Sequence, residues 1–297
     1  MKKFILISLL TVLAAGSARA QENPEVLQFM RTERSPRGMG LAGAGAASVQ
    51  SPAFAAFRGA AVIPLSGLTM DAGLAFQSWQ PGNEINKTTN IQLGGAGMLG
   101  PVALSLGGAW QSGQPEGAFT PSQMLVAAGV AYGFGPHFSL GVNARYARET
   151  LAEGLSLGGF SADITAAARF ARDFTAVAGV CMLGPQVAGS AKTYPQPTHA
   201  LAALAWHPVF GGVHAIEVLA DAEYYFSGSA AGSFGLEYSY DKTVFLRGGY
   251  RLGTGALPSH AAAGLGVQFV GLRVEAAYVF ASESLSGGLA VGLGYKF

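Results

Sequence analysis

The sequence predicts an all-β protein, a transmembrane antiparallel β-barrel of about fourteen strands with an amino-terminal hatch segment. One observation is the carboxyl terminus, where apolar residues alternate with small or polar ones from Gly288 to Phe297, as in a strand with one apolar face. A second is composition, because 50% of the residues are hydrophobic and only 12% are charged. A third is that no run of about 18 apolar residues follows Ala20, so no helical span is predicted.

The first twenty residues have the pattern of a secretory signal peptide. Two lysines follow the initiator methionine, residues 4–15 form an apolar core, and residues 18–20 read Ala-Arg-Ala, a small-x-small cleavage site. We therefore expect an exported protein whose mature chain begins at Gln21.

Charge and cysteine content exclude several classes of protein. The formal charge is +1, so the basic field that nucleic acids require is missing and no nucleic-acid partner is predicted. Cys181 is the one cysteine in the sequence, which allows neither an internal disulfide nor a metal cage built from cysteines. High apolar content with few charges also argues against disorder and against a soluble surface.

Residues 21–66 differ from the remainder and are predicted to form a hatch or plug. The stretch is charged from Gln21 to Arg37 and then rich in glycine and alanine, and Ser51 followed by Pro52 is a helix-start signal. Because this segment has no partner strand of its own, we expect it to fold inside or beneath a barrel formed by residues 67–297.

Beyond residue 67, alternation recurs in stretches of about ten residues, longer than the strands of a soluble β-sandwich, which is the alternative fold. Tight turns are predicted at residues 100–101, 135–136, 172–173, 241–242 and 270–271, and longer polar links, among them residues 149–160 and 184–197, lie between them. Barrels alternate short periplasmic turns with longer external loops in this way, so both termini are expected in the periplasm.

The chain ends on Phe297, with Tyr295 two residues before it. This ending resembles the terminal strand by which bacterial outer-membrane barrels are recognised and inserted. We therefore predict Tyr295 and Phe297 as an insertion signal, with outer-membrane lipid and the barrel-insertion machinery as partners. The predicted location is the bacterial outer membrane.

A set of charged residues shares the parity of the predicted lumen face. An arginine or lysine on the lipid face would cost about 2–4 kcal/mol at mid-depth, so these side chains must point inward. They are Asp71, Arg145, Asp163, Arg169, Glu217, Asp221, Glu223, Glu237, Arg247, Arg251, Arg273 and Glu275. Both signs are mixed, which predicts internal ion pairs that hold the wall and a plug, with contact to a solute as the alternative.

Two short motifs resemble catalytic or cofactor sites, and we reject both. Residues 38–43 match the glycine pattern of dinucleotide-binding turns, but no strand precedes them. Residues 154–158 match the nucleophile elbow of serine hydrolases, but they fall in a predicted external loop. His207 and His214 flank a turn and lack a third metal ligand. We therefore predict no cofactor, no metal and no enzymatic activity.

The amino-terminal segment resembles the opening of the PorV/PorQ family. The resemblance is carried by residues 27–30, by the run from Ser35 to Ala44, which contains Arg37, Gly38, Gly40 and Gly43, and by the stretch from Ala53 to Phe57. Where the family usually carries Asn-Pro-Ala, this chain has Arg58-Gly59-Ala60. The resemblance implies a fourteen-stranded barrel related to fatty acid transporters, with an amino-terminal hatch, that takes part in type IX protein secretion.

Three functions follow from these observations. The leading hypothesis is a non-enzymatic, PorV/PorQ-like component of type IX secretion or a related surface-assembly complex, whose partners would be secretion subunits or cargo. The alternative is a passive outer-membrane channel for small hydrophobic solutes, similar to fatty acid transporters. A barrel lipid hydrolase acting through Ser156 is the third.

Overall fold

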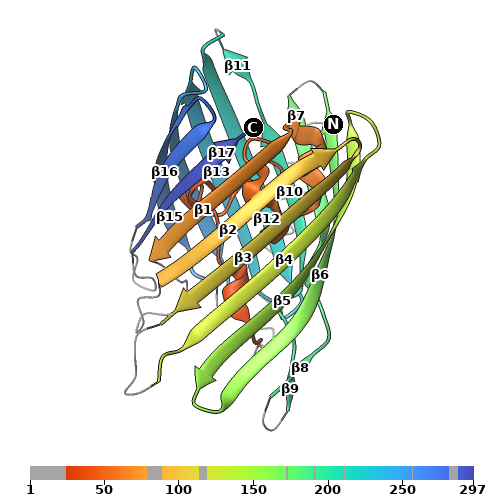
Figure 1. Ribbon diagram of the computed structural model, residues 1–297, viewed down its shortest axis with the longest axis vertical. Helices are drawn as coiled ribbons and strands as arrows, with labels where there is room; N and C mark the ends of the chain where they lie inside the picture. The colour runs from red at the N-terminus through yellow and green to blue at the C-terminus, as the bar shows by residue number, and fades with distance from the viewer. Residues whose placement is uncertain are drawn as a thin grey trace.

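Alternation of apolar with small or polar residues produces long antiparallel strands, which surround the amino-terminal helices (Figure 1). The structure, a computed structural model, describes residues 25–78, 89–113, 119–171, 173–189, 192–210, 212–255, 257–280 and 287–297. The predicted signal peptide, residues 1–20, lies outside the described residues, as do residues 21–24.

Fourteen long strands form the wall of the barrel. They are β1 Met70–Ser78, β2 Thr89–Leu99, β3 Val102–Ser112, β4 Ser122–Gly133, β5 Phe138–Ala152, β6 Leu155–Phe170, β7 Phe174–Leu183, β10 His199–Trp206, β12 His214–Tyr225, β13 Ala230–Tyr240, β14 Val244–Gly253, β15 His260–Phe269, β16 Leu272–Val279 and β17 Gly288–Lys296. Three two-residue strands accompany them, namely β8 Val187–Ala188, β9 Thr193–Tyr194 and β11 Val209–Phe210.

The sheet is antiparallel throughout and closes on itself. The first strand pairs with the last, with Leu74 opposite Leu293, and β10 pairs with β12 across the intervening link, with His199 opposite Tyr225. Among the described wall strands closure leaves no free edge, and this is what allows a sheet to span a bilayer. The predicted fold class, an antiparallel barrel of about fourteen strands, is confirmed.

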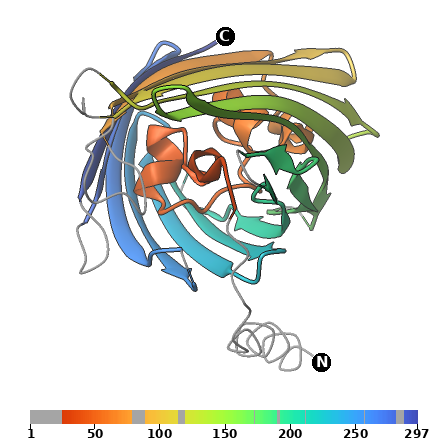
Figure 2. The same cartoon turned by 90° about the horizontal axis from the view of Figure 1, so that it is seen from below.

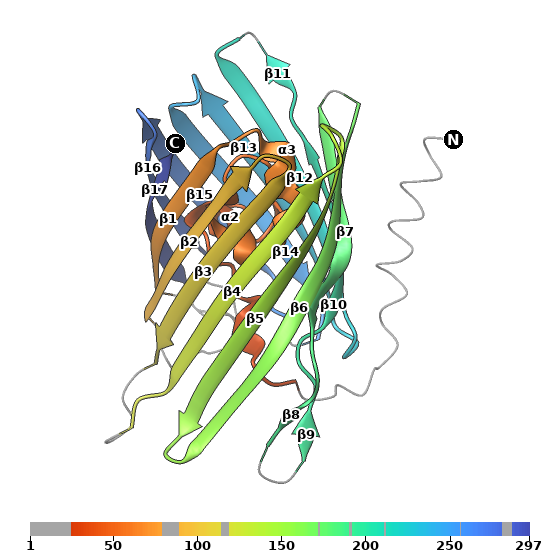
Figure 3. The same cartoon turned by 45° about the vertical axis from the view of Figure 1, so that its right-hand side comes forward.

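The two ends of the barrel differ. One end, which we call the turn end, carries the tight links such as those between β2 and β3 and between β15 and β16, and the chain terminus Phe297. The other, the loop end, carries the β5–β6 hairpin and the β8–β9 hairpin, which project furthest in Figure 3. By the rule for outer-membrane barrels the turn end faces the periplasm.

The prediction of an external loop over residues 149–160 is wrong. Strand β5 continues to Ala152 and β6 begins at Leu155, so Thr150 lies opposite Ser156 and the link is reduced to a tight turn with Gly154 at φ 73°. The glycines that suggested a loop serve close packing instead, because a Cβ on Gly159 would lie 2.9 Å from Cγ2 of Val187. The motif at residues 154–158 therefore lies on an antiparallel hairpin, where a nucleophile elbow does not occur.

Two aromatic belts mark the limits of the apolar outer face. The turn-end belt is formed by Tyr132, Phe134, Phe138, Phe170, Phe174, Trp206, Tyr295 and Phe297, and the loop-end belt by Trp110, Tyr146, Phe160, Tyr224, Phe226, Tyr278 and Phe280. Exposed leucines and valines, such as Leu106 at 67% exposure, cover the wall between the belts. The area of this apolar band is far larger than that of the apolar patches on water-soluble proteins. It matches the lipid-facing band of an outer-membrane barrel.

Residues 25–66 lie inside the barrel, as Figure 2 shows in the view along its axis. We call them the luminal segment. It contains only short helices: η2 Gln28–Arg31, α2 Pro36–Gly40, η3 Pro52–Phe57, η4 Ala60–Val62 and α3 Ile63–Ser66. Ser35 caps α2 by accepting a hydrogen bond from the Gly38 amide, whereas Ser51, predicted as a cap, makes no such bond. Among the helices that the structure describes, none is long and apolar enough to cross a membrane.

Glycines on the inner face of the wall make room for the luminal segment. A Cβ on Gly249 would lie 2.3 Å from the carbonyl carbon of Leu41, and one on Gly94 would lie 2.4 Å from the carbonyl oxygen of Ala53. On the opposite side, a Cβ on Gly141 would lie 2.5 Å from the Ala61 amide nitrogen. Real Cβ atoms do not approach other atoms so closely, so these positions require glycine for backbone contact.

Candidate functional site

The luminal segment is anchored to one wall by a continuous set of ion pairs. Arg37 of α2 donates from Nε to Oε2 of Glu237 at 2.9 Å and from Nη2 to Glu217. Glu237 also accepts from Nε of Arg247 at 2.5 Å, and Arg247 Nη2 reaches Oε1 of Glu275 at 2.9 Å. These side chains are nearly inaccessible to solvent, so each charge depends on its partners.

The set continues around the lumen to the first strand. Glu275 accepts from Nε of Arg273 at 3.2 Å, and Nη1 of Arg273 lies 3.3 Å from Oδ1 of Asp71. Asp71 in turn accepts a hydrogen bond of 3.0 Å from the Ala53 amide of η3. We call this set the charge network, and its members are Arg37, Asp71, Glu217, Glu237, Arg247, Arg273 and Glu275. It fixes the luminal segment at two points, α2 and η3.

A second anchor lies nearer the loop end. Asp221 accepts from the amides of Gly45 at 3.0 Å and Ala46 at 2.8 Å, and lies 3.2 Å from Nη2 of Arg58. Arg58 also pairs with Glu33 at 2.9 Å, so that two parts of the luminal segment are joined to each other and to β12.

The wall formed by β5 and β6 holds the segment mainly through its backbone. Asn143 accepts from the Ala60 amide at 2.8 Å and donates to the carbonyl oxygens of Ala55 at 3.2 Å and Ala56 at 3.1 Å. Arg145 Nη2 donates to the carbonyl of Phe57 at 2.7 Å and pairs with Asp163. The Asn143 side chain thus satisfies three buried backbone groups of the luminal segment.

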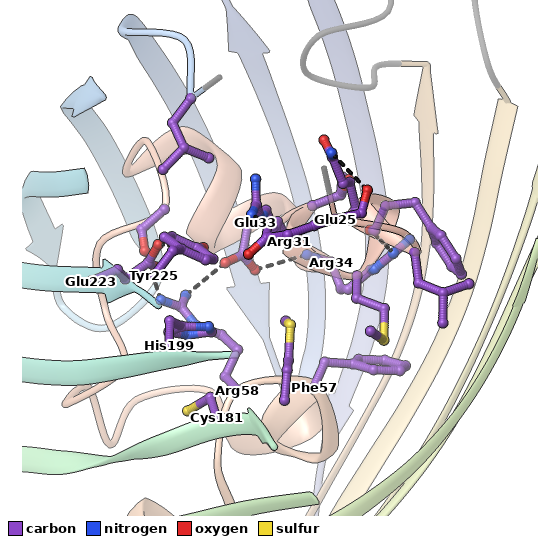
Figure 4. Close-up of a pocket in the computed structure, with 18 of the residues that line it drawn as sticks. Glu25, Arg31, Glu33, Arg34, Phe57, Arg58, Cys181, His199, Glu223 and Tyr225 are labelled. Atoms are coloured by element: carbon purple, nitrogen blue, oxygen red, sulfur yellow. Dashed lines mark hydrogen bonds and ion pairs between the residues drawn. The ribbon is translucent and has the colours of Figure 1, made fainter. Parts of the chain in front are cut away.

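A cavity of about 560 Å³ remains in the loop-end half of the lumen, above η3 and beside η2 (Figure 4). Its apolar lining includes Met30, Phe57, Met182 and Leu201. Its polar lining includes, among others, Arg34, Arg58, Arg145, Glu149, Glu223 and Tyr225. The volume and the mixed lining are those of a site for a small organic molecule.

A bulge in β7 shapes one side of this cavity. Ile164 lies opposite Val180, but Ala162 lies opposite Leu183, so β7 has one residue more than β6 over this stretch. Met182 has φ 54°, and its amide donates 2.8 Å to Oδ1 of Asp163. As a result Cys181 and Met182, although consecutive, are both buried and both line the cavity.

Arg34 forms part of the cavity lining and is fully enclosed, with 2% of its surface exposed. Its Nη2 donates 2.5 Å to the carbonyl of Phe29. Its Nε and Nη1 have no hydrogen-bond partner among the residues that the structure describes. Burial lowers the pKa of Arg34 to about 10, because removal from water disfavours the charged form. The side chain is still protonated at neutral pH.

The predicted hatch residues all lie in the luminal segment. Arg37 belongs to the charge network, and Phe57 forms the floor of the cavity. The three glycines lie at close approaches or turns: a Cβ on Gly38 would meet Glu33, one on Gly40 would lie 3.0 Å from Cα of Gly264, and Gly43 has φ 86°. The glycines of residues 38–43 therefore serve packing in the lumen, and a short helix, not a strand, contains the first two.

The predicted lumen charges point inward, and all but two of them fall into two groups. The charge network contains Asp71, Glu217, Glu237, Arg247, Arg273 and Glu275, whereas the cavity is lined by Arg145, Asp221, Glu223 and Arg251, of which Arg251 pairs with Glu223 at 2.6 Å. Asp163 pairs with Arg145, and Arg169 bonds to the carbonyl of Leu65 near the turn end. The predicted insertion signal, Tyr295 and Phe297, lies on the outer face with ring centroids 4.6 Å apart.

The sequence reasoning missed Arg34 and Arg58 as site residues. Both lie in the luminal segment, for which no periodicity indicates which side chains face a cavity. A metal centre is not formed by the described residues, among which no group of three or more histidine, cysteine or acidic side chains converges.

By sequence, no protein-family model matches the chain, and no curated protein matches it either. By structure, the chain is similar to the toluene transporter TbuX of Ralstonia pickettii, at 11% identity and a TM-score of 0.64 over 90% of this chain and 99% of that one. It is also similar to the monoaromatic hydrocarbon channel CymD, at 12% identity and a TM-score of 0.62 over 92% and 98%. A FadL homologue of Pseudomonas aeruginosa matches at 10% identity and a TM-score of 0.59 over 91% and 99%.

The closed barrel, its apolar band and these likenesses define the class: the chain is a bacterial outer-membrane β-barrel. Its fold is similar to that of the FadL homologue and of the toluene and monoaromatic hydrocarbon transporters. At such low identity the likeness shows the fold alone. The comparisons give no support to the resemblance to PorV and PorQ, which stays a prediction from the amino-terminal residues.

Proposed function

We propose that this protein is a passive outer-membrane channel for small, mainly hydrophobic solutes, and that it acts without catalysis. The cavity of about 560 Å³ in the loop-end half of the lumen carries the proposal, since it offers a partly apolar site on the outer side of a plugged barrel. The named neighbours of the same fold, toluene and monoaromatic hydrocarbon transporters, support this class of solute.

In this proposal the luminal segment is the hatch. It fills the lumen between the cavity and the turn end, where Arg169 bonds to the carbonyl of Leu65. Deleting residues 25–60 should therefore raise ion conductance in planar bilayers. Unchanged conductance would mean that the segment does not close the lumen.

A larger side chain placed in the cavity tests whether solutes pass through it. Leu201 on β10 faces the cavity with 7% exposure, and Leu204 on the same strand faces outward with 39% exposure. Leu201→Trp should reduce toluene uptake into proteoliposomes several-fold, because the larger side chain occupies the cavity, while Leu204→Trp should leave uptake unchanged. Equal uptake by both variants would place the solute path elsewhere.

A role in type IX secretion is the other candidate function, and it is supported by the resemblance of the amino-terminal segment to the PorV/PorQ family. It predicts that secretion subunits or cargo co-purify with the protein from native membranes. Tyr295 and Phe297 are proposed to engage the barrel-insertion machinery before the barrel reaches the lipid. Their place on the outer face of the last strand is consistent with that role.

A further inference from the structure

The outer face of the wall carries one arginine, which lies near the loop end. Arg148 of β5 is exposed and alternates with the buried residues Ala147 and Glu149, so its side chain points outward. In the fourteen wall strands, as far as the structure describes them, every other arginine, lysine, aspartate and glutamate has the parity of the lumen face. Arg148 forms no ion pair with any described residue. Its charge is therefore available to a partner outside the barrel.

Arg148 lies just beyond the loop-end belt. Tyr146 and Phe160 belong to this belt, with ring centroids 4.8 Å apart, and Arg148 follows Tyr146 by two residues in the direction of the loop end. Two residues of a strand advance about 7 Å. An outward arginine is costly in the middle of a bilayer but costs little near the bilayer surface. The position of Arg148 is thus at the depth of the lipid head groups.

Hydroxyl groups lie on the same outer face, on both sides of Arg148. Towards the tip of the hairpin, Thr150 of β5 is opposite Ser156 of β6, and their hydroxyl oxygens are 3.1 Å apart. Gly158 of β6 is opposite Arg148. A Cβ on Gly158 would lie 3.2 Å from the Tyr146 hydroxyl oxygen, so this phenol points toward the level of Arg148. Arg148 therefore lies between a phenol on its membrane side and two hydroxyls on its outer side.

The carboxylates of this hairpin lie elsewhere. Glu149 points into the lumen, where it lines the cavity, and Glu153 lies in the turn at the tip. Strands β5 and β6 are the longest of the wall, with 15 and 16 residues, and their hairpin projects at the loop end (Figure 3). Its outer face, as described, is therefore a surface with one positive charge and several hydroxyls beside the outer leaflet.

The outer leaflet of a bacterial outer membrane contains lipopolysaccharide, whose lipid A sugars carry phosphate groups at head-group depth. Anionic head groups attract basic side chains next to a membrane. A guanidinium donates paired N–H groups to two oxygens of a phosphate, and hydroxyls supply further donors. We propose that Arg148, together with Thr150 and Ser156, binds a lipid A phosphate on the outer face of the β5–β6 hairpin. This site is independent of any solute that passes through the lumen.

Native mass spectrometry of the detergent-solubilised full chain with added lipid A tests the proposal. The probes are lipid A with both phosphates and the same lipid after removal of its phosphates. The wild type should bind the phosphorylated lipid about fivefold more tightly or better, the factor expected for a single basic side chain at an anionic surface. Arg148→Gln should remove this preference, because the charge is lost. Arg148→Lys should retain most of it.

Lys192→Gln is the matched control. Lys192 is also an exposed basic residue at the loop end, but it lies on the β8–β9 hairpin, where its Nζ is 5.1 Å from the ring centroid of Tyr194. Its substitution removes the same charge from the same end of the barrel without touching the outer face of the β5–β6 hairpin. The preference for phosphorylated lipid A should therefore be unchanged in this variant.

Three results would overturn the site. They are a wild type that binds both lipids equally, an Arg148→Gln variant that keeps the preference, and an equal loss in Arg148→Gln and Lys192→Gln, which would assign binding to the overall charge of the loop end. Heat-modified gel mobility checks that each variant folds, and the comparison of the two lipids on the wild type requires no variant. Toluene uptake by Arg148→Gln should equal that of the wild type, so the phosphate site and the channel are tested separately.

Discussion

The two sides of the lumen use buried arginine in opposite ways. On the side of β12 to β14 and β16, Arg37, Arg247 and Arg273 each meet two carboxylates, and together they hold the luminal segment against the wall. On the side of the cavity, Arg34 meets none among the described residues, and Arg145 keeps two unpartnered nitrogens. Arginines paired with two carboxylates therefore hold the luminal segment against the wall, whereas Arg34 lines the cavity without an ion pair.

The physical reason for this difference is the free-energy cost of removing a charged side chain from water. A buried ion pair gains little net stability, but removing one partner leaves an uncompensated charge at a cost of several kcal/mol. The charge network is therefore expected to be sensitive to loss of any member. Arg34 has no ion-pair partner among the described residues and already bears part of that cost, so its removal should be tolerated.

The largest expected effect is loss of a carboxylate from the charge network. Glu237→Gln should lower the free energy of unfolding by roughly 3 kcal/mol or more, because Arg37 and Arg247 both lose their shared partner. Urea unfolding in detergent, followed by tryptophan fluorescence, measures the change.

Glu149→Gln provides the control on the cavity side. Glu149 is also a buried wall glutamate, with 9% exposure, and it has no ion pair among the described residues. Its substitution should cost less than about 1 kcal/mol. If Glu149→Gln and Glu237→Gln lower the free energy of unfolding by the same amount, the two sides of the lumen do not differ as described.

An intermediate effect is expected where the wall touches the luminal segment. Gly249→Ala would place a Cβ 2.3 Å from the backbone of Leu41, so we expect a loss of about 1–3 kcal/mol from overpacking and displacement of α2. Gly248 is the adjacent residue, and its Cβ would meet nothing within 4 Å. Gly248→Ala should therefore be neutral in the same unfolding measurement. A neutral Gly249→Ala would show that the segment is loosely held on this side.

The smallest effect on stability is expected at Arg34. Arg34→Met replaces a buried charge that has no ion-pair partner by an apolar side chain, so the free energy of unfolding should be unchanged or higher by up to about 1 kcal/mol. Destabilisation as large as that of Glu237→Gln would contradict the contrast between the two sides.

Much of the fold could be predicted because strand alternation is local. Rows such as Leu289, Val291 and Leu293 face lipid, and the charged residues of opposite parity face the lumen. The prediction failed over residues 149–160, where Gly158 and Gly159 interrupt the apolar row. Glycine does not indicate which face of a strand points to lipid and which to the lumen. A glycine-rich strand and a loop are therefore hard to distinguish in sequence.

The site was less predictable than the wall. Arg145, Asp221, Glu223 and Arg251 were placed in the lumen by parity, and they line the cavity. Arg34 was not predicted as a site residue. The short helices around it are too brief to show a hydrophobic period, so the sequence does not indicate which of their side chains are buried.

The sequence by itself determined the class of barrel, the inward direction of the charges and the apolar outer face, since each follows from the two-residue period of a strand. Only the tertiary structure decided which charges pair. Arg37 and Glu237 are 200 residues apart in the chain, and their contact depends on the path of the luminal segment through the closed barrel. That path leaves Arg34 without a carboxylate and creates the cavity beside it.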